Sequence, residues 1–234
     1  MDKPLIVLYT HTDAKDVWDA WYGQYEKYLS EYDLCLCVNQ GVDISDSSLS
    51  NHQTVFYDDN LTYTQRLQGV MNELGDRTIL FLHEDMILYS DVDHDRLETF
   101  TKLVNNESVK SVKLIYVGDI CYVSSVHDEL VENAYSKFSI QPTIIKTKTI
   151  LDILESVGDL NIWDFENAIN HYEGHYMVKL GNESKRGIFH YDSLVFPYVA
   201  TAIVKGKWNY TEYPQELSYL FEQYGINPEE RGVA

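Results

Sequence analysis

The sequence predicts an α/β fold in which a mixed, mainly parallel sheet is flanked by helices. Short, almost continuously apolar segments alternate with longer segments of helical periodicity over residues 4–82, in the order strand, helix, strand, strand, helix, strand. Strands that are apolar on both sides are typical of parallel sheets with helices on both faces. Hydrophobic residues make up 44% of the 234 residues, which is enough for one sizeable core.

The regular part of this pattern lies in the first half of the chain. Apolar, strand-like segments occupy residues 4–10, 34–38, 54–57 and 78–82. Helices are expected over residues 14–30 and 61–74, where apolar side chains recur every three to four positions. Gly75 directly follows the second helix, at a position where glycine commonly ends a helix.

The second half is less regular. We expect helices over residues 97–104, 149–157, 161–172 and 214–224, and strands over residues 109–117, 140–145, 187–191 and 196–204. The polar residues 227–234 are expected to form a loose tail. Because no linker rich in Pro, Gly or Ser divides the chain, we predict a single domain with two unequal halves, residues 1–90 and 91–226.

The net charge of −19 restricts the possible partners. Such a surface repels nucleic-acid backbones and anionic membranes, so neither is expected as a partner. It also repels a phosphate-bearing substrate, unless a cation and a few basic side chains neutralise the site locally. No apolar segment approaches the roughly 20 residues needed to span a bilayer, so no membrane span is expected.

Cysteine usage favours a reducing compartment. Cys35 and Cys37 alternate with apolar residues in one predicted strand, which indicates packing, and Cys121 leaves an odd total of 3. The first residues lead straight into a strand-length apolar segment and not into a signal peptide. We therefore expect a cytoplasmic protein, or one of the host cytoplasm if its source is a virus.

The most informative segment is the apolar strand 78–82, which is followed at once by His83, Glu84 and Asp85. Open α/β sheets bind their ligands at the carboxyl ends of the strands. Carboxylate oxygens at such an edge suit Mg²⁺ or Mn²⁺, and these ions commonly bridge to phosphate. Asp85 is the candidate direct ligand, and Glu84 would act through water or on a sugar. The alternative is a strand that ends in a solvated acidic turn.

Four basic or imidazole side chains are further candidates. Arg66 either pairs with a nearby aspartate or approaches a substrate phosphate. Lys205 and Lys207 flank a glycine, where they either clamp a diphosphate or belong to an ordinary strand-end turn. His190 either completes the coordination of a metal held by Asp85 or is a half-buried structural histidine.

The tetrapeptide Trp163-Asp164-Phe165-Glu166 alternates aromatic and acidic side chains. All four cannot face a core, so one pair is expected to point at solvent or into a cleft. Aromatic faces stack on sugar rings, and a carboxylate beside them can deprotonate a hydroxyl. Glycine-rich phosphate loops of the P-loop or dinucleotide-binding spacing do not occur, which argues against ATP hydrolysis by a P-loop and against dinucleotide redox chemistry.

Taken in order, these features resemble the GT-A class of nucleotide-sugar glycosyltransferases, and in particular the small glycosyltransferase-like proteins of large viruses, phages and bacteria. The matching segments are the opening strand with Thr10-His11-Thr12, the helix before the acidic strand, residues 79–86 at the place of the Asp-x-Asp metal motif, and residues 163–166 at the place of the acceptor element. His83-Glu84-Asp85 departs from a literal Asp-x-Asp, so the first acidic position does not match.

The resemblance implies a GT-A-like fold with a nucleotide-sugar-binding half (1–90) and a smaller acceptor-binding half (91–226). It implies a bound Mn²⁺ or Mg²⁺, a nucleotide diphospho-sugar donor linked to UDP or GDP, and a glycan or other hydroxyl acceptor. Thr10, His11 and Thr12 would lie near the nucleotide and Arg66 near the donor. The function expected is inverting glycosyl transfer.

By the same resemblance, Trp163 would contact the acceptor, and Glu166 or Asp164 would act as the base. Lys205 or Lys207 would offset charge on the departing nucleoside diphosphate. Two other functions stay open: a metal-dependent phosphohydrolase that uses the same acidic edge, and a non-catalytic carbohydrate-binding module, which the 19 tyrosines and 4 tryptophans would suit.

Overall fold

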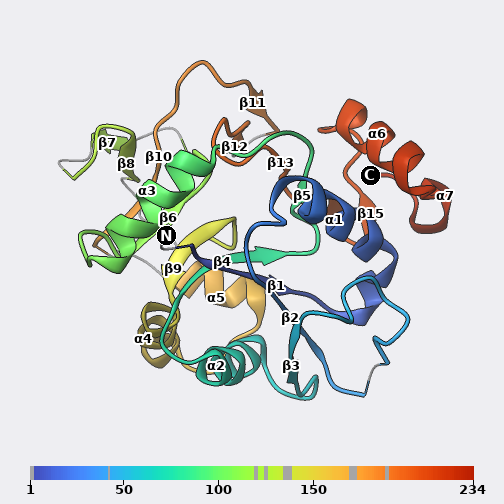
Figure 1. Ribbon diagram of the computed structural model, residues 1–234, viewed down its shortest axis with the longest axis horizontal. Coiled ribbons are helices and arrows are strands. Elements are labelled where there is room, and N and C mark those ends of the chain that lie inside the picture. Colours follow the sequence, from blue (N-terminus) through green and yellow to red (C-terminus); the bar gives the residue numbers. More distant parts are fainter. Residues whose placement is uncertain are drawn as a thin grey trace.

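The computed structural model of the chain contains a nine-stranded mixed sheet with helices on both faces (Figure 1). The structure describes residues 3–41, 43–118, 121–123, 126–133, 139–168, 173–187 and 190–234, without the side chains of residues 121–123, 133 and 190. The α/β fold class predicted from the sequence is thereby confirmed.

The central sheet has the strand order β3-β2-β1-β4-β9-β6-β10-β8-β7. Its strands are β1 (Leu5–Tyr9), β2 (Leu34–Asn39), β3 (Gln53–Tyr57), β4 (Thr78–His83), β6 (Ser111–Lys113), β7 (Cys121–Val123), β8 (Leu130–Asn133), β9 (Thr143–Lys146) and β10 (His175–Val178). The first four pair with one another in parallel, as the sequence predicts. β9 is antiparallel to both β4 and β6, and β10 is parallel to β6. The carboxyl ends of β4, β6 and β10 therefore face the same edge.

Seven α-helices and one short 3₁₀ helix are described. They are η1 (Thr12–Ala14), α1 (Lys15–Tyr28), α2 (Tyr63–Leu74), α3 (His94–Asn105), α4 (Thr147–Val157), α5 (Ile162–Ala168), α6 (Pro214–Tyr224) and α7 (Pro228–Arg231). In Figure 1, α1 and α3 lie above the sheet, and α2, α4 and α5 lie below it. Every residue of β1 and β2 is consequently buried, which explains their continuous apolar sequence.

Three small two-stranded sheets replace the long strands expected near the end of the chain. β5 (Ile87–Leu88) pairs with β13 (Tyr198–Val199), β11 (Lys185–Arg186) with β12 (His190–Tyr191), and β14 (Ile203–Val204) with β15 (Lys207–Trp208). The expected strand 196–204 is interrupted at Thr201, whose φ of 62° does not fit a strand.

The expected boundaries fail most clearly at the C-terminus. In place of a loose tail, Asn227 caps α7 by accepting a hydrogen bond from the Glu229 amide, and Pro228 occupies its first turn. Arg231 donates from Nε to Asp16 Oδ2 at 2.9 Å, and Val233 forms a bridge with Trp208. These contacts attach the last residues to α1 and β15.

Other boundaries differ more modestly. The strand expected over residues 109–117 is restricted to 111–113, and the helix expected over 161–172 is described over 162–168, with residues 169–172 outside the described part. β7, β8 and β10 were not expected from the sequence. Strands of three or four residues are too short to show an alternating pattern.

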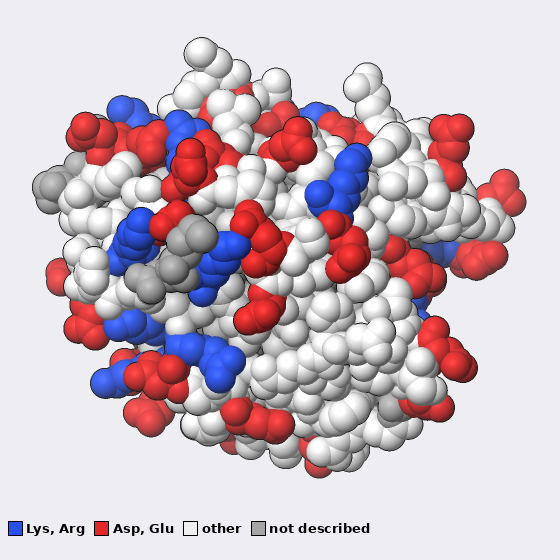
Figure 2. Space-filling model, viewed as in Figure 1, with Lys and Arg blue, Asp and Glu red and all other residues white. Residues whose placement is uncertain are grey.

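The charge of the chain is visible at its surface. In Figure 2, acidic side chains are spread over the whole face shown, whereas Lys and Arg gather mainly on its left side, where Figure 1 places α3 and α4. Within the described ranges, every helix is too short or too polar to cross a lipid bilayer.

Helix α2 begins with a capping box, which provides a test of the fold. Thr62 accepts a hydrogen bond from the Gln65 amide, and Gln65 Oε1 accepts one from the Thr62 amide at 3.1 Å. We expect Thr62→Ala to lower the free energy of unfolding by about 1 kcal/mol, since it leaves the Gln65 amide without its cap.

Urea unfolding measures this effect. Thr99→Ala is the matched control, because Thr99 lies inside α3 and its hydroxyl bonds the Asp95 carbonyl, so that its loss should be neutral or slightly stabilising. Equal stability changes in the two variants would contradict the assignment of the cap.

Candidate functional site

The candidate site lies where β1 and β4 end side by side. Tyr9 pairs with His83 in the parallel register of these strands, so Thr10 and Glu84 leave the sheet at the same level. The Ala202 amide donates to the Asp85 carbonyl at 2.8 Å, which holds the segment before β14 against the acidic residues. The sequence prediction that Glu84 and Asp85 stand at the carboxyl edge of a buried strand is confirmed.

Glu84 and Asp85 are half-buried, and burial raises the pKa of both carboxyl groups. The neighbouring Asp85 charge raises the pKa of Glu84 further, whereas the Thr10 hydroxyl and the Arg231 charge lower it. For Asp85, the Glu166 charge adds to the rise in pKa. The carboxyl groups therefore keep their protons to a higher pH than ordinary carboxyl groups, and the site as it stands disfavours two negative charges.

His83 belongs to an aromatic cluster. Its ring stacks on Tyr9 with centroids 5.3 Å apart, and its Nε2 lies 3.4 Å from the Tyr63 hydroxyl. Burial lowers the pKa of His83 to about 4, so the imidazole is neutral at pH 7. The Tyr57 ring also stacks on Tyr9, with ring centroids 5.0 Å apart. The packed rings of Tyr9, Tyr57, Tyr63 and His83 therefore lie next to the acidic residues Glu84 and Asp85.

The segment after β1 is fixed by neighbouring strands. The buried Thr10 hydroxyl accepts a hydrogen bond from Trp18 Nε1 at 2.9 Å, and the Thr10 carbonyl accepts one from the Tyr57 hydroxyl at 2.7 Å. The Thr12 amide donates to Asn39 Oδ1 at 3.0 Å, at the end of β2. Asn39 was not singled out from the sequence, although its place directly after an apolar strand is a usable signal.

His11 and Arg66 meet through one aspartate. His11 Nδ1 accepts a hydrogen bond from the Asp13 amide at 3.1 Å, so Nε2 carries the proton that faces Asp59 Oδ2 at 3.0 Å. Arg66 Nη1 donates to the other oxygen of Asp59 at 2.5 Å, and its guanidinium lies over the Tyr57 ring. The structure thus shows Arg66 in the ion-paired arrangement, beside the loop after β1.

The aromatic and acidic tetrapeptide divides between solvent and interior. On α5, Phe165 is buried and Trp163 is 73% exposed. Asp164 is exposed and its carboxylate accepts a hydrogen bond from Asn161 Nδ2 at 2.6 Å. Glu166 is half-buried, and its Oε1 accepts a hydrogen bond from the Ile140 amide at 2.7 Å. Of the two candidate bases, Glu166 is the one directed toward the interior.

Lys113 is a residue that the sequence analysis missed. It ends β6, is buried, and donates from Nζ to Ser139 Oγ at 2.6 Å. Burial lowers the pKa of Lys113 to about 8, and the Glu166 charge opposes this shift. A lysine followed directly by four apolar residues of the predicted strand 109–117 was the available signal. Lys113, Glu166 and Asp85 form an electrostatically linked group.

The remaining predicted residues lie at the margin. Lys205 and Gly206 have φ angles of 50° and 79°, so they form the tight turn of the β14–β15 hairpin, and the side chains of Lys205 and Lys207 are exposed. Arg231 reaches this turn through the Gly206 carbonyl, at 3.5 Å from Nη1. The side chain of His190 lies outside the described residues, so its expected role as a metal ligand stays a prediction.

Comparisons with known proteins show similarity at the level of solved structures. No protein-family model matches the chain, and no curated protein matches it. HddC from Yersinia pseudotuberculosis is 11% identical over 94% of this chain and 99% of that chain, with a TM-score of 0.49. A 4-diphosphocytidyl-2C-methyl-D-erythritol synthase is 10% identical over 78% and 91%, with a TM-score of 0.48.

A third solved structure, UDP-glucose pyrophosphorylase in complex with UDP-glucose, is 10% identical over 76% of this chain and 92% of that chain, with a TM-score of 0.45. These identities and TM-scores below 0.5 support no conclusion about the reaction of this chain.

The acidic edge should make the cation-free protein sensitive to pH. Because the pKa values of Glu84 and Asp85 are raised in the folded state, the stability present at low pH is lost as pH rises through these values. We expect Glu84→Gln and Asp85→Asn to stabilise the protein by about 1–3 kcal/mol at about pH 8, and by less at about pH 5.

Urea unfolding in the presence of a chelator measures this difference at both pH values. Glu155→Gln, an exposed position on α4, is the control and should change little at either pH. A destabilisation by the site variants at the higher pH would contradict the electrostatic description of the edge.

Proposed function

We propose that the protein is a divalent-cation-dependent glycosyltransferase that moves a sugar from a nucleotide diphospho-sugar to a hydroxyl acceptor. The observation that carries the proposal is the pair Glu84 and Asp85, held half-buried at the carboxyl end of β4 beside the fixed loop after β1. Carboxylates at such an edge can hold a cation that grips a diphosphate.

The residues present fit an ion that is shared with substrate. Within the described part of the chain, no group of three or more His, Cys, Asp and Glu side chains is arranged to hold a metal ion. An ion that bridges a nucleotide diphosphate needs one or two protein carboxylates, with phosphate oxygens and water as its other ligands. Asp85 and Glu84 supply these carboxylates, and their raised pKa values indicate that burial outweighs the nearby groups that favour their charged forms.

The loop after β1 would position the nucleotide, and Asp85 with Glu84 would hold Mn²⁺ or Mg²⁺. When bound, the ion supplies positive charge to the departing diphosphate. During transfer, the bond between the anomeric carbon and the diphosphate oxygen breaks, and a bond from that carbon to the acceptor oxygen forms. In the inverting reaction Glu166 takes the acceptor proton, and the nucleoside diphosphate leaves with the electron pair of the broken bond.

The surroundings of Glu166 suit a base. Burial raises the pKa of its carboxyl group, while the Ile140 amide and the Lys113 charge lower it. A base whose pKa lies closer to the working pH transfers protons more efficiently than an ordinary surface carboxylate. Trp163 would provide an exposed face for the acceptor ring. Lys205 and Lys207 would act on the diphosphate from the hairpin turn.

Thermal unfolding with UDP or GDP, with and without Mn²⁺, tests the binding part of the proposal. We expect a rise in melting temperature that requires both nucleotide and ion, because each completes the site of the other. Asp85→Asn should abolish this rise, and Glu155→Gln should keep it. A rise with nucleotide alone that survives Asp85→Asn would refute the assignment of the ion site.

Release of nucleoside diphosphate from UDP- and GDP-sugars, in the presence of a panel of glycan acceptors, tests the chemistry. Glu166→Gln should keep nucleotide binding and lower turnover by about 10²–10⁴-fold, the usual contribution of a general base. Loss of turnover in Asp164→Asn with full activity in Glu166→Gln would move the base to Asp164. Unchanged turnover in both variants would favour a retaining reaction.

Other products would assign other functions. Release of phosphate from phosphate esters would indicate a metal-dependent phosphohydrolase. Formation of a nucleotide sugar and pyrophosphate from a nucleoside triphosphate and a sugar phosphate would indicate nucleotidyl transfer. Glycan binding that needs neither cation nor nucleotide would indicate a carbohydrate-binding module.

A further inference from the structure

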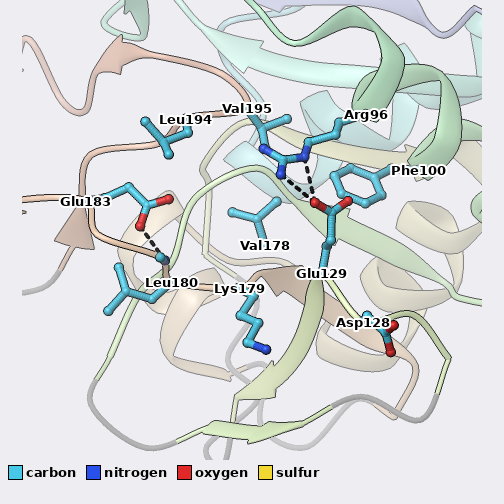
Figure 3. A pocket seen from close by; sticks show the side chains of 11 residues that line it. Arg96, Phe100, Asp128, Glu129, Val178, Lys179, Leu180, Glu183, Leu194 and Val195 are labelled. Atoms are coloured by element: carbon cyan, nitrogen blue, oxygen red, sulfur yellow. Dashed lines mark hydrogen bonds and ion pairs between the residues drawn. The ribbon is translucent and has the colours of Figure 1, made fainter.

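A cavity of about 320 Å³ lies apart from the acidic residues of the candidate site. Its walls come from α3, from the residues before β8, from the end of β10 and the segment that follows it, and from residues 194–195 (Figure 3). Two backbone hydrogen bonds frame it: the Lys179 amide donates to the Glu129 carbonyl at 2.8 Å, and the Asp93 amide donates to the Val195 carbonyl at 3.0 Å. A cavity of this size lies at the lower end of the range for small-molecule sites.

The floor of the cavity is apolar. Phe100, Val178 and Val195 line it and are otherwise buried in the core. Leu194, which is 61% exposed, and Leu180 stand on one side of the cavity in Figure 3. An apolar ligand body would therefore be covered by side chains that already belong to a rigid core.

The cationic group deepest in the wall is already neutralised. Arg96 donates from Nε and Nη2 to Glu129 Oε1 at 2.8 and 2.5 Å, and its Nη1 lies 3.6 Å from Asp93 Oδ2. The pKa of Arg96 is raised, chiefly by the hydrogen bond to Glu129. Two carboxylates thus share one guanidinium.

A further half-buried carboxylate faces this pair. Glu183 accepts a hydrogen bond from the Gly181 amide, and Figure 3 shows it across the floor from Arg96 and Glu129. The Glu183 charge also contributes to the raised pKa of Arg96, so the two walls lie within electrostatic reach of each other. At the exposed rim, the positive charge of Lys179 and the negative charge of Asp128 cancel. The side chains that line the cavity therefore carry a net charge of −1, and Asp93, which pairs with Arg96, adds a further negative charge nearby.

We propose that this cavity binds a small molecule with an apolar body and one ammonium group. The body would lie on Phe100, Val178 and Val195, and the ammonium would lie between the carboxylates of Glu183 and Glu129. A neutral molecule of the same shape would keep the apolar contact but would leave the Glu183 carboxylate without a cation. An anionic molecule would be repelled by the carboxylates of Glu183 and Glu129. The site goes beyond the proposed glycosyl transfer and shares no residue with it.

Three probes of similar size and shape test the proposal: 3-phenylpropylamine, 3-phenylpropan-1-ol and 3-phenylpropanoate. Titration into the ¹⁵N-labelled full-length protein, followed by NMR chemical shifts, reports both affinity and location. We expect the amine to bind about two- to fivefold more tightly than the alcohol, as a partly exposed ion pair allows, and the carboxylate to bind most weakly. Shifted amides should include those of Val178, Gly181 and Val195.

Two variants separate charge from shape. Glu183→Gln keeps an oxygen for the Gly181 amide and should lower the affinity for the amine about two- to fivefold while leaving that for the alcohol unchanged. Leu180→Trp, at the half-buried rim, should block all three probes, and Glu155→Gln on α4 should affect none. Equal affinities for the three probes, an unchanged ratio of amine to alcohol in Glu183→Gln, or shifts confined to other surfaces would overturn the proposal.

Discussion

The in-register parallel pairing of β1 with β4 is the constraint on which the candidate site depends. Val7 lies opposite Phe81 and Tyr9 lies opposite His83, so the two strands end at the same level. A slip of one residue would turn every side chain of a strand to the opposite face of the sheet. Both strands are covered by helices on both faces, and such a slip would separate the loop after β1 from the acidic residues. The buried core therefore fixes the geometry of the site.

Two adjacent, half-buried carboxyl groups are locally unfavourable for the folded protein, and the rest of the fold compensates for their cost. A molecule with a net charge of −19 already repels further negative charge, yet Glu84 and Asp85 stand side by side in a half-buried position. Burial and the Asp85 charge raise the pKa of Glu84, and the Thr10 hydroxyl and the Arg231 charge oppose this rise only in part. Clusters of perturbed carboxyl groups are typical of functional sites, where a ligand supplies the missing positive charge. The proposed cation would do this here.

The strands of the first half and the residues at their ends were predictable, because the sequence patterns that mark them lie within a few neighbouring positions. Continuous apolar segments mark β1, β2 and β4, and the residue after a buried strand must lie at the sheet edge. The pairing of Arg66 with Asp59 was one of the alternatives that its acidic neighbourhood offered. Which aspartate it would choose depends on the path of the chain after β3, which composition alone does not determine.

The second half was less predictable for physical reasons. Strands of two residues, such as β12 and β14, are too short for an alternating hydrophobic pattern to be recognised, so that only their partners define them. Lys113 is buried because β6 lies inside the sheet between β9 and β10, a position that follows from topology and not from local sequence. The ordered tail depends on Arg231 meeting Asp16, which lies more than two hundred positions earlier in the chain.

Helix geometry separates the two carboxylates of α5, and the neighbouring Ile140 amide lies on the side of Glu166. Successive residues on an α-helix are rotated by about 100°, so Asp164 and Glu166 point in nearly opposite directions around buried Phe165. Trp163 and Glu166, three positions apart, lie on neighbouring lines of the same helix face. A sugar ring stacked on the exposed tryptophan would therefore lie on the side of Glu166 and not of Asp164. The spacing that brings one aromatic face and one half-buried carboxylate together is what makes Glu166 the stronger candidate for the base.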